Sequence, residues 1–303
     1  MKPATLLDLH WAGHPRSIAS ALLRLGDCVA LVDPGPSSTI ANLRDQLAAH
    51  GLRISDLDAL LLTHIHLDHA GASGSLVREN PRLRVYVHSR GAPHMADPSK
   101  LLDSARRLYG DTIERLYGEF LAVPPANLGI LEGGETLSFG SRQLQVVYTP
   151  GHASHHVTYF DAWEGLAFVG DTAGIAIEGH PFILPATPPP DINLELWSTS
   201  LDAIAALDPK RLFLTHFSFC DHPARHIASY RERLLRWSEL VAKILSEGVE
   251  ESQASEAFIN AIAAEARKSL TQEEVDHYLY NGALQLSWLG LARYHRKRGA
   301  APA

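Results

Sequence analysis

The sequence is poor in several residue types, and each shortage excludes a class of protein. Two Cys among 303 residues exclude a disulfide framework and a Cys-rich zinc module. Lys and Arg number 27 against 34 Asp and Glu, a net charge of −7, so the chain lacks the basic character typical of nucleic-acid binders. No apolar run approaches the roughly 18 residues of a membrane span, and Asp8 and His10 interrupt any signal-peptide core. We therefore expect a cytoplasmic protein that acts on a small molecule, with neither nucleic acid nor membrane as a partner.

Histidine, by contrast, is abundant, with 17 residues beside only 2 Met. Hydrophobic residues make up 46% of the chain and charged residues 20%, so the protein can bury a sizeable core. Its length suits one large domain or two small ones. We take histidine as the side chain that carries the chemistry.

Through the first two thirds of the chain, short apolar runs alternate with turn signals and helical stretches. Strands are predicted at residues 27–33, 57–63, 84–88, 143–149, 156–161, 166–169 and 211–214. Helices are predicted at residues 39–50, 98–119 and 193–207. The proline-rich residues 185–190 are predicted to form a loop. This alternation favours a layered α/β fold.

The pattern changes at about residue 223 and is helical from there on. Apolar residues recur every three or four positions between residues 227 and 244, which predicts an amphipathic helix. Two more helices are predicted at 255–269 and 271–296, the second opening with a Thr271-x-x-Glu274 capping box. We therefore divide the chain into a catalytic domain, residues 1–222, and a helical extension packed on it, residues 223–303. Composition leaves open whether the extension also makes a homodimer.

The densest histidine cluster directly follows the predicted strand 57–63. The segment THIHLDHAG, residues 63–71, places His64, His66, Asp68 and His69 within six residues. Loops at the carboxyl ends of strands are where α/β proteins place their sites. Imidazole and carboxylate ligands suit Zn, Fe or Mn, and four of them exceed what one catalytic ion normally takes from one loop.

Three further candidates also follow predicted strands. His152 follows strand 143–149 in TPGH, Asp171 follows 166–169 in GDT, and His216 follows 211–214 in THF. A lone His at a strand end is more often a structural hydrogen-bond partner than a ligand, but here the placement recurs. If the strands share one edge of a sheet, all seven groups converge.

In these motifs and their order, the chain resembles the metallo-β-lactamase superfamily, specifically its glyoxalase II-like dinuclear branch, over about residues 1–220. The resemblance implies a four-layer αβ/βα sandwich, here followed by the helical extension. It also implies two divalent metal ions, Zn²⁺ first, with Fe or Mn open. The implied ligands are His64, His66 and His152 for the first ion, Asp68, His69 and His216 for the second, and Asp171 between them. Asp33, in VDPG, matches a position that buttresses the site without being a ligand.

Departures from other branches narrow the activity. The β-lactam-hydrolysing enzymes that use a Cys ligand have that Cys at the position of Asp171. The Asp at this position therefore argues against β-lactams as substrates. His66 and Asp68 differ from the H-x-E-x-D of flavodiiron proteins. We find no basic C-terminal element of the kind that grips glutathione, and no Tyr shortly after Asp171 as in acyl-homoserine-lactone lactonases.

The resemblance therefore implies hydrolysis of a lactone, ester or thioester, with a hydroxide between the two ions as the nucleophile. Asp68 and Asp171 would be the catalytic carboxylates, and the leaving group would be either held by the second ion or protonated by Asp68. The first alternative is a phosphodiesterase or nuclease of the same fold, which the charge of −7 disfavours. The second is a mono-iron oxidoreductase of the persulfide dioxygenase kind, and the third is a non-catalytic member. Cys220 is interpreted as a small apolar residue rather than a catalytic thiol.

The remaining histidines are assigned by position. Of His155 and His156, we expect one to point inward as a hydrogen-bond donor to a ligand and the other to point outward. His88 and His94 flank a loop whose Arg90 would bind an anionic substrate group, with a solvated Arg as the simpler alternative. Six others are expected at the surface or as helix caps: His10, His50, His222, His226, His277 and His295.

Two segments are expected to decide specificity. The loop at 179–191, after Asp171, is expected to line the pocket mouth, and the helical block 98–119 the opposite wall. Their apolar residues would make the substrate moderately hydrophobic, with ordinary core packing as the alternative. These residues are Phe182, Ile183 and Leu184 in the loop, and Leu108, Tyr109, Leu116, Tyr117 and Phe120 in and just after the helical block.

Overall fold

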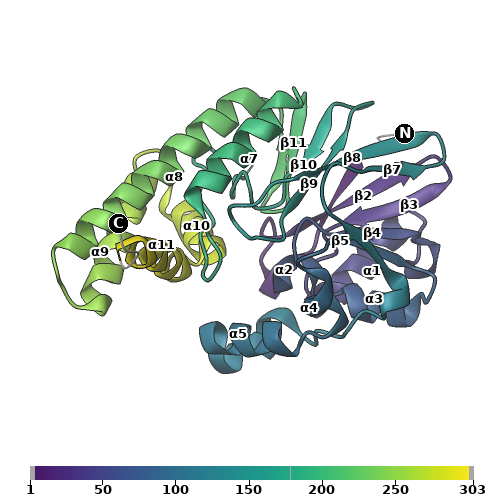
Figure 1. The fold of residues 1–303 in the computed structure, drawn as a ribbon, viewed down its shortest axis with the longest axis horizontal. Helices are drawn as coiled ribbons and strands as arrows, with labels where there is room; N and C mark the ends of the chain where they lie inside the picture. Colours follow the sequence, from purple (N-terminus) through teal and green to yellow (C-terminus); the bar gives the residue numbers. More distant parts are fainter. Residues whose placement is uncertain (1–3, 178, 300–303) are drawn as a thin grey trace.

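Two six-stranded sheets packed face to face form the centre of the computed structural model, which describes residues 4–177 and 179–299 (Figure 1). The first sheet has the order β1 (Ala4–Asp8), β2 (Ala19–Leu25), β3 (Cys28–Val32), β4 (Ala59–Leu61), β5 (Arg84–His88) and β6 (Leu128–Leu131). The second has the order β12 (Ser218–Cys220), β11 (Arg211–Leu214), β10 (Leu166–Phe168), β9 (Val157–Asp161), β8 (Arg142–Tyr148) and β7 (Thr136–Phe139). Strands β3 to β6 run parallel, as do β10 and β11, whereas the other pairs are antiparallel.

Helices cover the outer face of each sheet. On the first sheet lie α1 (Ile40–Ala49), α2 (Leu67–Ala70), α3 (Ser73–Glu79), α4 (Ala92–Ala96), α5 (Ser99–Tyr109) and α6 (Ile113–Tyr117). On the second lies α7 (Leu194–Ala206), and α8 (Pro223–Ser246) packs on α7. Beyond α8 lie α9 (Glu251–Ala266) and α11 (Leu284–Gly299), which pack on it and on each other, and α10 (Gln272–Gly282), which adjoins α9. The predicted αβ/βα sandwich with a helical extension is therefore confirmed. No helix among the described residues is long and apolar enough to cross a membrane.

Three apolar clusters hold these four layers together. One lies between the sheets and includes Val32, Tyr159 and Phe213. A second joins the first sheet to its helices, and a third joins the second sheet to the C-terminal helices around the fully buried Trp197 and Trp237. Burial of apolar surface in these clusters is the main force that fixes the layers.

The C-terminal helices differ from the prediction in two places. The helix expected at 255–269 begins at Glu251, because the sequence before Ser255 contains no helix-breaking residue after Gly248. The helix expected at 271–296 is two helices, since Ala283 has left-handed backbone angles (φ 40°, ψ 57°) that end α10. The capping box is present: Glu274 N–H donates to Thr271 Oγ1, and Thr271 N–H to the Glu274 carboxylate.

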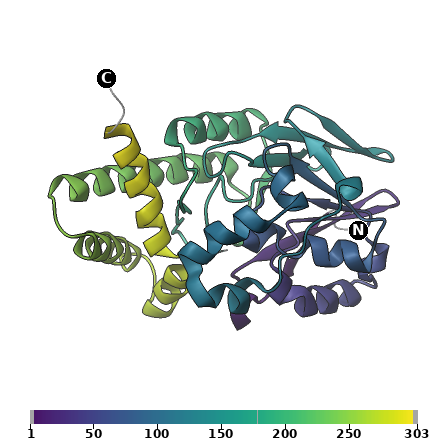
Figure 2. The same cartoon turned by 60° about the horizontal axis from the view of Figure 1, so that its bottom comes forward.

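This break places the start of α11 opposite α5. Figures 1 and 2 both show the two helices, which are far apart in sequence, facing each other at the edge of the sandwich. Leu108 of α5 and Leu286 of α11 line the same pocket. The helical extension thus contributes directly to the site described next.

Candidate metal centre

Four loops bring the seven predicted ligands together at one edge of the sandwich. The loop after β4 carries His64 and His66 and leads into α2, which carries Asp68 and His69. The turns after β8, β10 and β11 carry His152, Asp171 and His216. Gly170 (φ 46°) allows the Asp171 turn to approach the first loop, because a Cβ there would stand 2.5 Å from Thr63 Oγ1.

The first donor group consists of three imidazoles. His66 Nδ1 lies 3.0 Å from His64 Nε2 and 3.0 Å from His152 Nε2. Burial lowers the pKa of His64 well below its usual range and that of His66 to about 3, so these rings are neutral. His152 Nδ1–H donates to the Ala186 carbonyl at 2.9 Å, which leaves the lone pair of Nε2 facing the other two rings.

The second donor group combines two imidazoles and a carboxylate. His216 Nε2 lies 3.3 Å and His69 Nε2 3.9 Å from Asp68 Oδ2. His216 Nδ1–H donates to the Ser17 carbonyl at 2.9 Å, so its Nε2 is also free to face the centre.

Asp171 lies between the two groups. Its Oδ2 is 3.4 Å from His152 Nε2 in the first group. Its Oδ1 is 3.2 Å from His69 Nε2 and 3.6 Å from His216 Nε2 in the second. One carboxylate thus presents one oxygen to each group, which is the arrangement required of a bridging ligand.

Buried polar atoms at this centre test whether a metal fits. His69 Nε2 and Asp171 Oδ1 are both buried and lie 3.2 Å apart, but neither forms a hydrogen bond of good geometry within the described structure. Buried polar atoms without hydrogen bonds are costly, and ligation would satisfy both. Sets of three donors that lie within 4.8 Å of one another recur three times across the seven side chains. The residues therefore fit divalent metal ions held by nitrogen and oxygen.

Charge at the centre also favours cations. Burial opposes ionisation of Asp171, but His69, His216 and His152 hold the pKa of its carboxyl well below the usual range. Burial also opposes ionisation of Asp68, but the charge of His69 and the contacts with His216 lower its pKa to about 2. Although burial alone would lower the pKa of His69, the carboxylates of Asp171, Asp33 and Asp68 raise it well above its usual value. A metal ion at neutral pH would therefore displace a proton from His69.

Asp33 supports the centre from behind. Its Oδ2 accepts hydrogen bonds from His69 Nδ1 (2.8 Å), Thr63 Oγ1 (2.7 Å) and Thr215 Oγ1 (2.9 Å), and its Oδ1 accepts from the Thr63 N–H (2.8 Å). The residue is fully buried and has a left-handed φ of 50°. A single carboxylate thus ties two ligand-bearing loops together and fixes which nitrogen of His69 faces the centre.

The expectation that one of His155 and His156 points outward is wrong. Both are buried, because they precede β9 in an irregular turn where the alternation of strand side chains does not apply. His156 lies against Thr149 and Thr172, whose hydroxyls are 3.0 and 3.1 Å from its Nδ1. His155 faces the pocket, with its ring 5.8 Å from that of His66.

Two other assignments concern residues away from the centre. His226 was expected at the surface or as a helix cap, and this expectation is wrong. The residue is buried, and its Nε2–H donates to the Ala173 carbonyl at 2.8 Å. The helical spacing could have indicated this burial, because His226 stands four positions before Tyr230 on the buried face of α8. Burial raises the pKa of Cys220, which agrees with its interpretation as an apolar residue.

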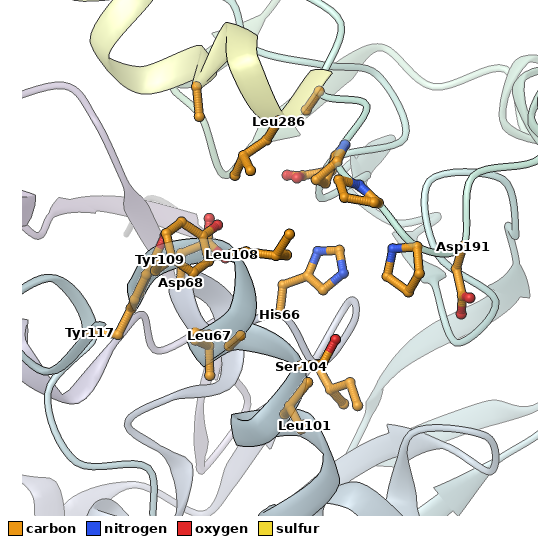
Figure 3. A pocket seen from close by; sticks show the side chains of 18 of the residues that line it. His66, Leu67, Asp68, Leu101, Ser104, Leu108, Tyr109, Tyr117, Asp191 and Leu286 are labelled. Atoms are coloured by element: carbon orange, nitrogen blue, oxygen red, sulfur yellow. The ribbon is translucent and has the colours of Figure 1, made fainter. Parts of the chain in front are cut away.

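The centre opens into a pocket of about 600 Å³ (Figure 3). Leu108, Tyr109, Leu116 and Tyr117 form one wall as predicted, whereas Phe120 belongs to the core. The loop 179–191 lines the pocket through residues 186–191, but Phe182, Ile183 and Leu184 lie in the core instead. Arg90 and His94 reach the pocket, whereas His88 is buried and stacks on Tyr148.

Lys100, Arg115 and Asp191 also line the pocket and stand in the two predicted wall segments, whereas Trp11, Tyr280 and Leu286 were missed from the sequence. None stands in a motif. Tyr280 and Leu286 flank the break at Ala283, so a prediction of one unbroken helix could not place them at the centre.

The fold and the centre define a class of protein: a two-sheet αβ/βα sandwich with a candidate metal centre of His and Asp at one edge. A family model for the metallo-β-lactamase superfamily matches residues 14–216, about two thirds of the chain. The chain belongs to this superfamily, and it is a hydrolase of that kind with a candidate metal-binding cluster.

Individual relatives are distant. The metallo-beta-lactamase fold-containing protein ST1585 of Sulfurisphaera tokodaii is 28% identical over 66% of this chain and 72% of its own length. A hydroxyacylglutathione hydrolase of Aeromonas hydrophila is 27% identical over 71% of this chain and 70% of its own length. Another, from Synechococcus sp. (strain JA-3-3Ab), is 32% identical, and the match spans only about half of that relative, 48%.

One solved structure matches the full chain. The metallo-beta-lactamase family protein TTHA1429 from Thermus thermophilus superposes on 100% of this chain and 96% of its own, with a TM-score of 0.73 and 23% identity. At this identity the likeness shows the fold alone.

Proposed function

We propose that the chain is a dinuclear metal-dependent hydrolase of an ester, thioester or lactone. The observation that carries the proposal is Asp171, whose two carboxylate oxygens face different donor groups at 3.2–3.6 Å. Two groups of three donors with a shared carboxylate between them suit a pair of ions better than one. Zn²⁺ is the first candidate for the nitrogen-rich donors, with Fe or Mn as alternatives.

When bound, divalent ions at such a centre would supply hydroxide at neutral pH and polarise the carbonyl oxygen of the substrate. The ions would be held by His64, His66, His152, Asp68, His69 and His216, with Asp171 shared. The chain's own residues supply the rest. Asp33 fixes His69 in one tautomer, and the carbonyls of Ala186 and Ser17 do the same for His152 and His216.

Asp68 is the side chain placed to move a proton. It is only half-buried and lines the pocket, so a leaving group can reach its carboxylate. With a pKa of about 2, Asp68 is ionised at rest and cannot start the reaction as an acid. We assign it as a shuttle: Asp68 accepts the proton of the attacking water and passes it to the leaving oxygen or sulfur. The water oxygen bonds to the acyl carbon as the C–O or C–S bond breaks. One water proton reaches the leaving atom through Asp68, and the other stays on the product acid, which releases it to solvent at neutral pH.

The relatives named hydroxyacylglutathione hydrolase support the choice of an acyl bond, as does the negative net charge, which disfavours a polyanionic nucleic acid. To test the proposal, chelator-treated protein would be reloaded with Zn²⁺, Mn²⁺ or Fe²⁺ and assayed on thioesters, p-nitrophenyl esters and lactones, with bis-p-nitrophenyl phosphate in parallel.

Two results would contradict the proposal. Preference for the phosphodiester would favour the phosphodiesterase alternative. One iron per chain together with oxygen consumption on a persulfide would favour the dioxygenase alternative. Asp171→Ala serves as the control for background hydrolysis.

A further inference from the structure

The pocket above the centre has two ends of different chemistry. One end is aromatic and apolar, with Trp11 from the N-terminal segment, Tyr109 and Tyr117 from the α5–α6 block, and Tyr280 from the extension. The ring centroids of Trp11 lie 5.6 Å from Tyr117 and 5.8 Å from Tyr280, and those of Tyr109 and Tyr117 are 5.0 Å apart. Three segments distant in sequence thus build one continuous apolar wall.

Aliphatic side chains continue this wall toward the centre. Figure 3 shows Leu286 of α11 and Leu108 of α5 projecting into the pocket from opposite sides, near His66. Both are only half-buried, so their apolar surface is available to a ligand. An apolar chain in this space would be removed from water on both sides.

The other end is cationic. Arg90, His94 and Lys100 all line the pocket and come from residues 90–100, between β5 and the first turn of α5. Among the described residues, neither Arg90 nor Lys100 has a carboxylate within 4.0 Å. Arg90 instead lies over the Tyr148 ring, 5.9 Å from its centroid. These are unpaired cations in a chain with a net charge of −7.

Acidic groups at the pocket do not cancel this charge. Besides the candidate ligands Asp68 and Asp171, the carboxylate in the lining is Asp191, which accepts a hydrogen bond from Ser154 at 2.9 Å. A further cation, Arg115 of α6, also lines the pocket. The lining outside the candidate metal centre is therefore positive on balance.

The centre lies between the two ends. Helix α5 runs from Lys100 at the cationic end to Tyr109 at the aromatic end, and its Ser104 and Leu108 line the pocket near His66 (Figure 3). Tyr109 lies near enough to Asp68 for the carboxylate to contribute, after burial, to raising its pKa to about 12. The aromatic end thus adjoins the second donor group.

We propose that the substrate is an acyl ester or thioester whose apolar acyl chain lies between α5–α6 and the start of α11 and whose leaving group is anionic and is bound by Arg90, His94 and Lys100. This inference rests on the proposed hydrolase function, because it places the scissile carbonyl at the centre. It assigns the helical extension a role in selecting the acyl chain. The basic side chains come from the turn before α4 (Arg90), from α4 (His94) and from α5 (Lys100).

Binding of non-hydrolysable analogues tests the inference separately from catalysis. The probes are S-alkyl thioethers of coenzyme A, which carry phosphates, and S-alkyl thioethers of the neutral N-acetylcysteamine, each over a series of alkyl lengths, measured by calorimetry. We expect affinity to rise about fourfold per methylene until the apolar end is filled. At equal alkyl length, the anionic series should bind more tightly, and added salt should remove that advantage.

Two pairs of variants test which residues bind the acyl chain and which bind the anionic group. Leu286→Trp should weaken long-chain binding about tenfold or more and leave short chains unchanged, whereas Gln285→Trp, on the same helix but outside the pocket, should change neither. If Leu286→Trp does not fold, Leu286→Ala should move the optimum to longer chains. Lys100→Ala should weaken only the anionic series, up to about fivefold, and Arg107→Ala, on the same helix outside the pocket, should not.

Affinity that is independent of chain length, or equal losses for both series in Lys100→Ala, would overturn the inference while leaving the hydrolase proposal intact. Conversely, the expected binding pattern in a metal-loaded protein that hydrolyses no acyl bond would overturn the hydrolase proposal and confirm the ligand class of the pocket.

Discussion

Replacement of Asp33 by Asn tests the support of the centre, because it removes a charge and one acceptor while keeping the shape. The carboxylate accepts four hydrogen bonds, three at Oδ2 and one at Oδ1. An amide keeps only one acceptor oxygen. If the new NH₂ replaces Oδ1, it faces the Thr63 N–H. If it replaces Oδ2, it faces His69 Nδ1, which can then accept only in the tautomer that protonates Nε2.

Either orientation of the new amide carries a cost. One lost hydrogen bond to a buried charged acceptor lowers the free energy of unfolding by about 1.5–3 kcal/mol. Loss of a carboxylate behind a ligating His typically weakens metal binding by about 10–100-fold. Urea unfolding in the presence of a chelator measures the first effect, and competition with a chromophoric chelator measures the second.

Asp161→Asn is the matched control. Asp161 is also buried and bonded, to Arg142, but it ends β9 at the end away from the centre. This variant should lose stability and keep the metal affinity of the wild type. If Asp33→Asn also kept that affinity, the proposed link from Asp33 through His69 to the metal would be refuted.

Four other substitutions probe the ligands, a tight turn and a buried histidine. Asp171→Ala or His66→Ala should lose metal and activity together and keep the fold, as measured by metal analysis, hydrolysis and circular dichroism; full activity in either variant would contradict the ligand assignment. Gly151→Ala should lower the free energy of unfolding by about 1–3 kcal/mol, because φ is 144° and the new Cβ would stand 2.4 Å from Trp197 Cα; unchanged urea unfolding would contradict this. Burial lowers the pKa of His226, so the unfolded chain binds the proton more readily and stability falls as pH drops below about 6.5. The melting temperature of His226→Gln should therefore depend less on pH between about 7.5 and 5.5 than that of the wild type. An equal dependence of melting temperature on pH would contradict this.

Local patterns predicted much of the fold. The strand at 84–88 and the strand at 211–214 have the predicted bounds, and the strand at 27–33 differs by one residue at each end. These runs are apolar and end at turn residues, so the local signal and the tertiary structure agree. By contrast, β1, β2, β6, β7 and β12 were not predicted. All but β2 have five residues or fewer, and they are held mainly by pairing with neighbouring strands.

Convergence of the seven side chains was predictable from topology, since each follows a strand. Their supports were less visible. Ala186 and Ser17 act through backbone carbonyls, which no residue type reveals, and the contacts of Asp33 span up to 182 positions in sequence. Tyr109 and Tyr117 of the apolar end were predicted, but Tyr280 and Leu286 were not, because their place in the pocket depends on one residue, Ala283, leaving the helical region of backbone angles.

Metal stoichiometry and activity, followed together on one sample, decide whether a pair of ions acts at this centre. Chelator-stripped protein would be titrated with Zn²⁺ while bound metal and hydrolysis of a thioester are measured at each step. We expect two ions per chain, with activity reaching its maximum as the second binds. Maximal activity with a single ion per chain, or unchanged activity in the stripped protein, would contradict the dinuclear assignment.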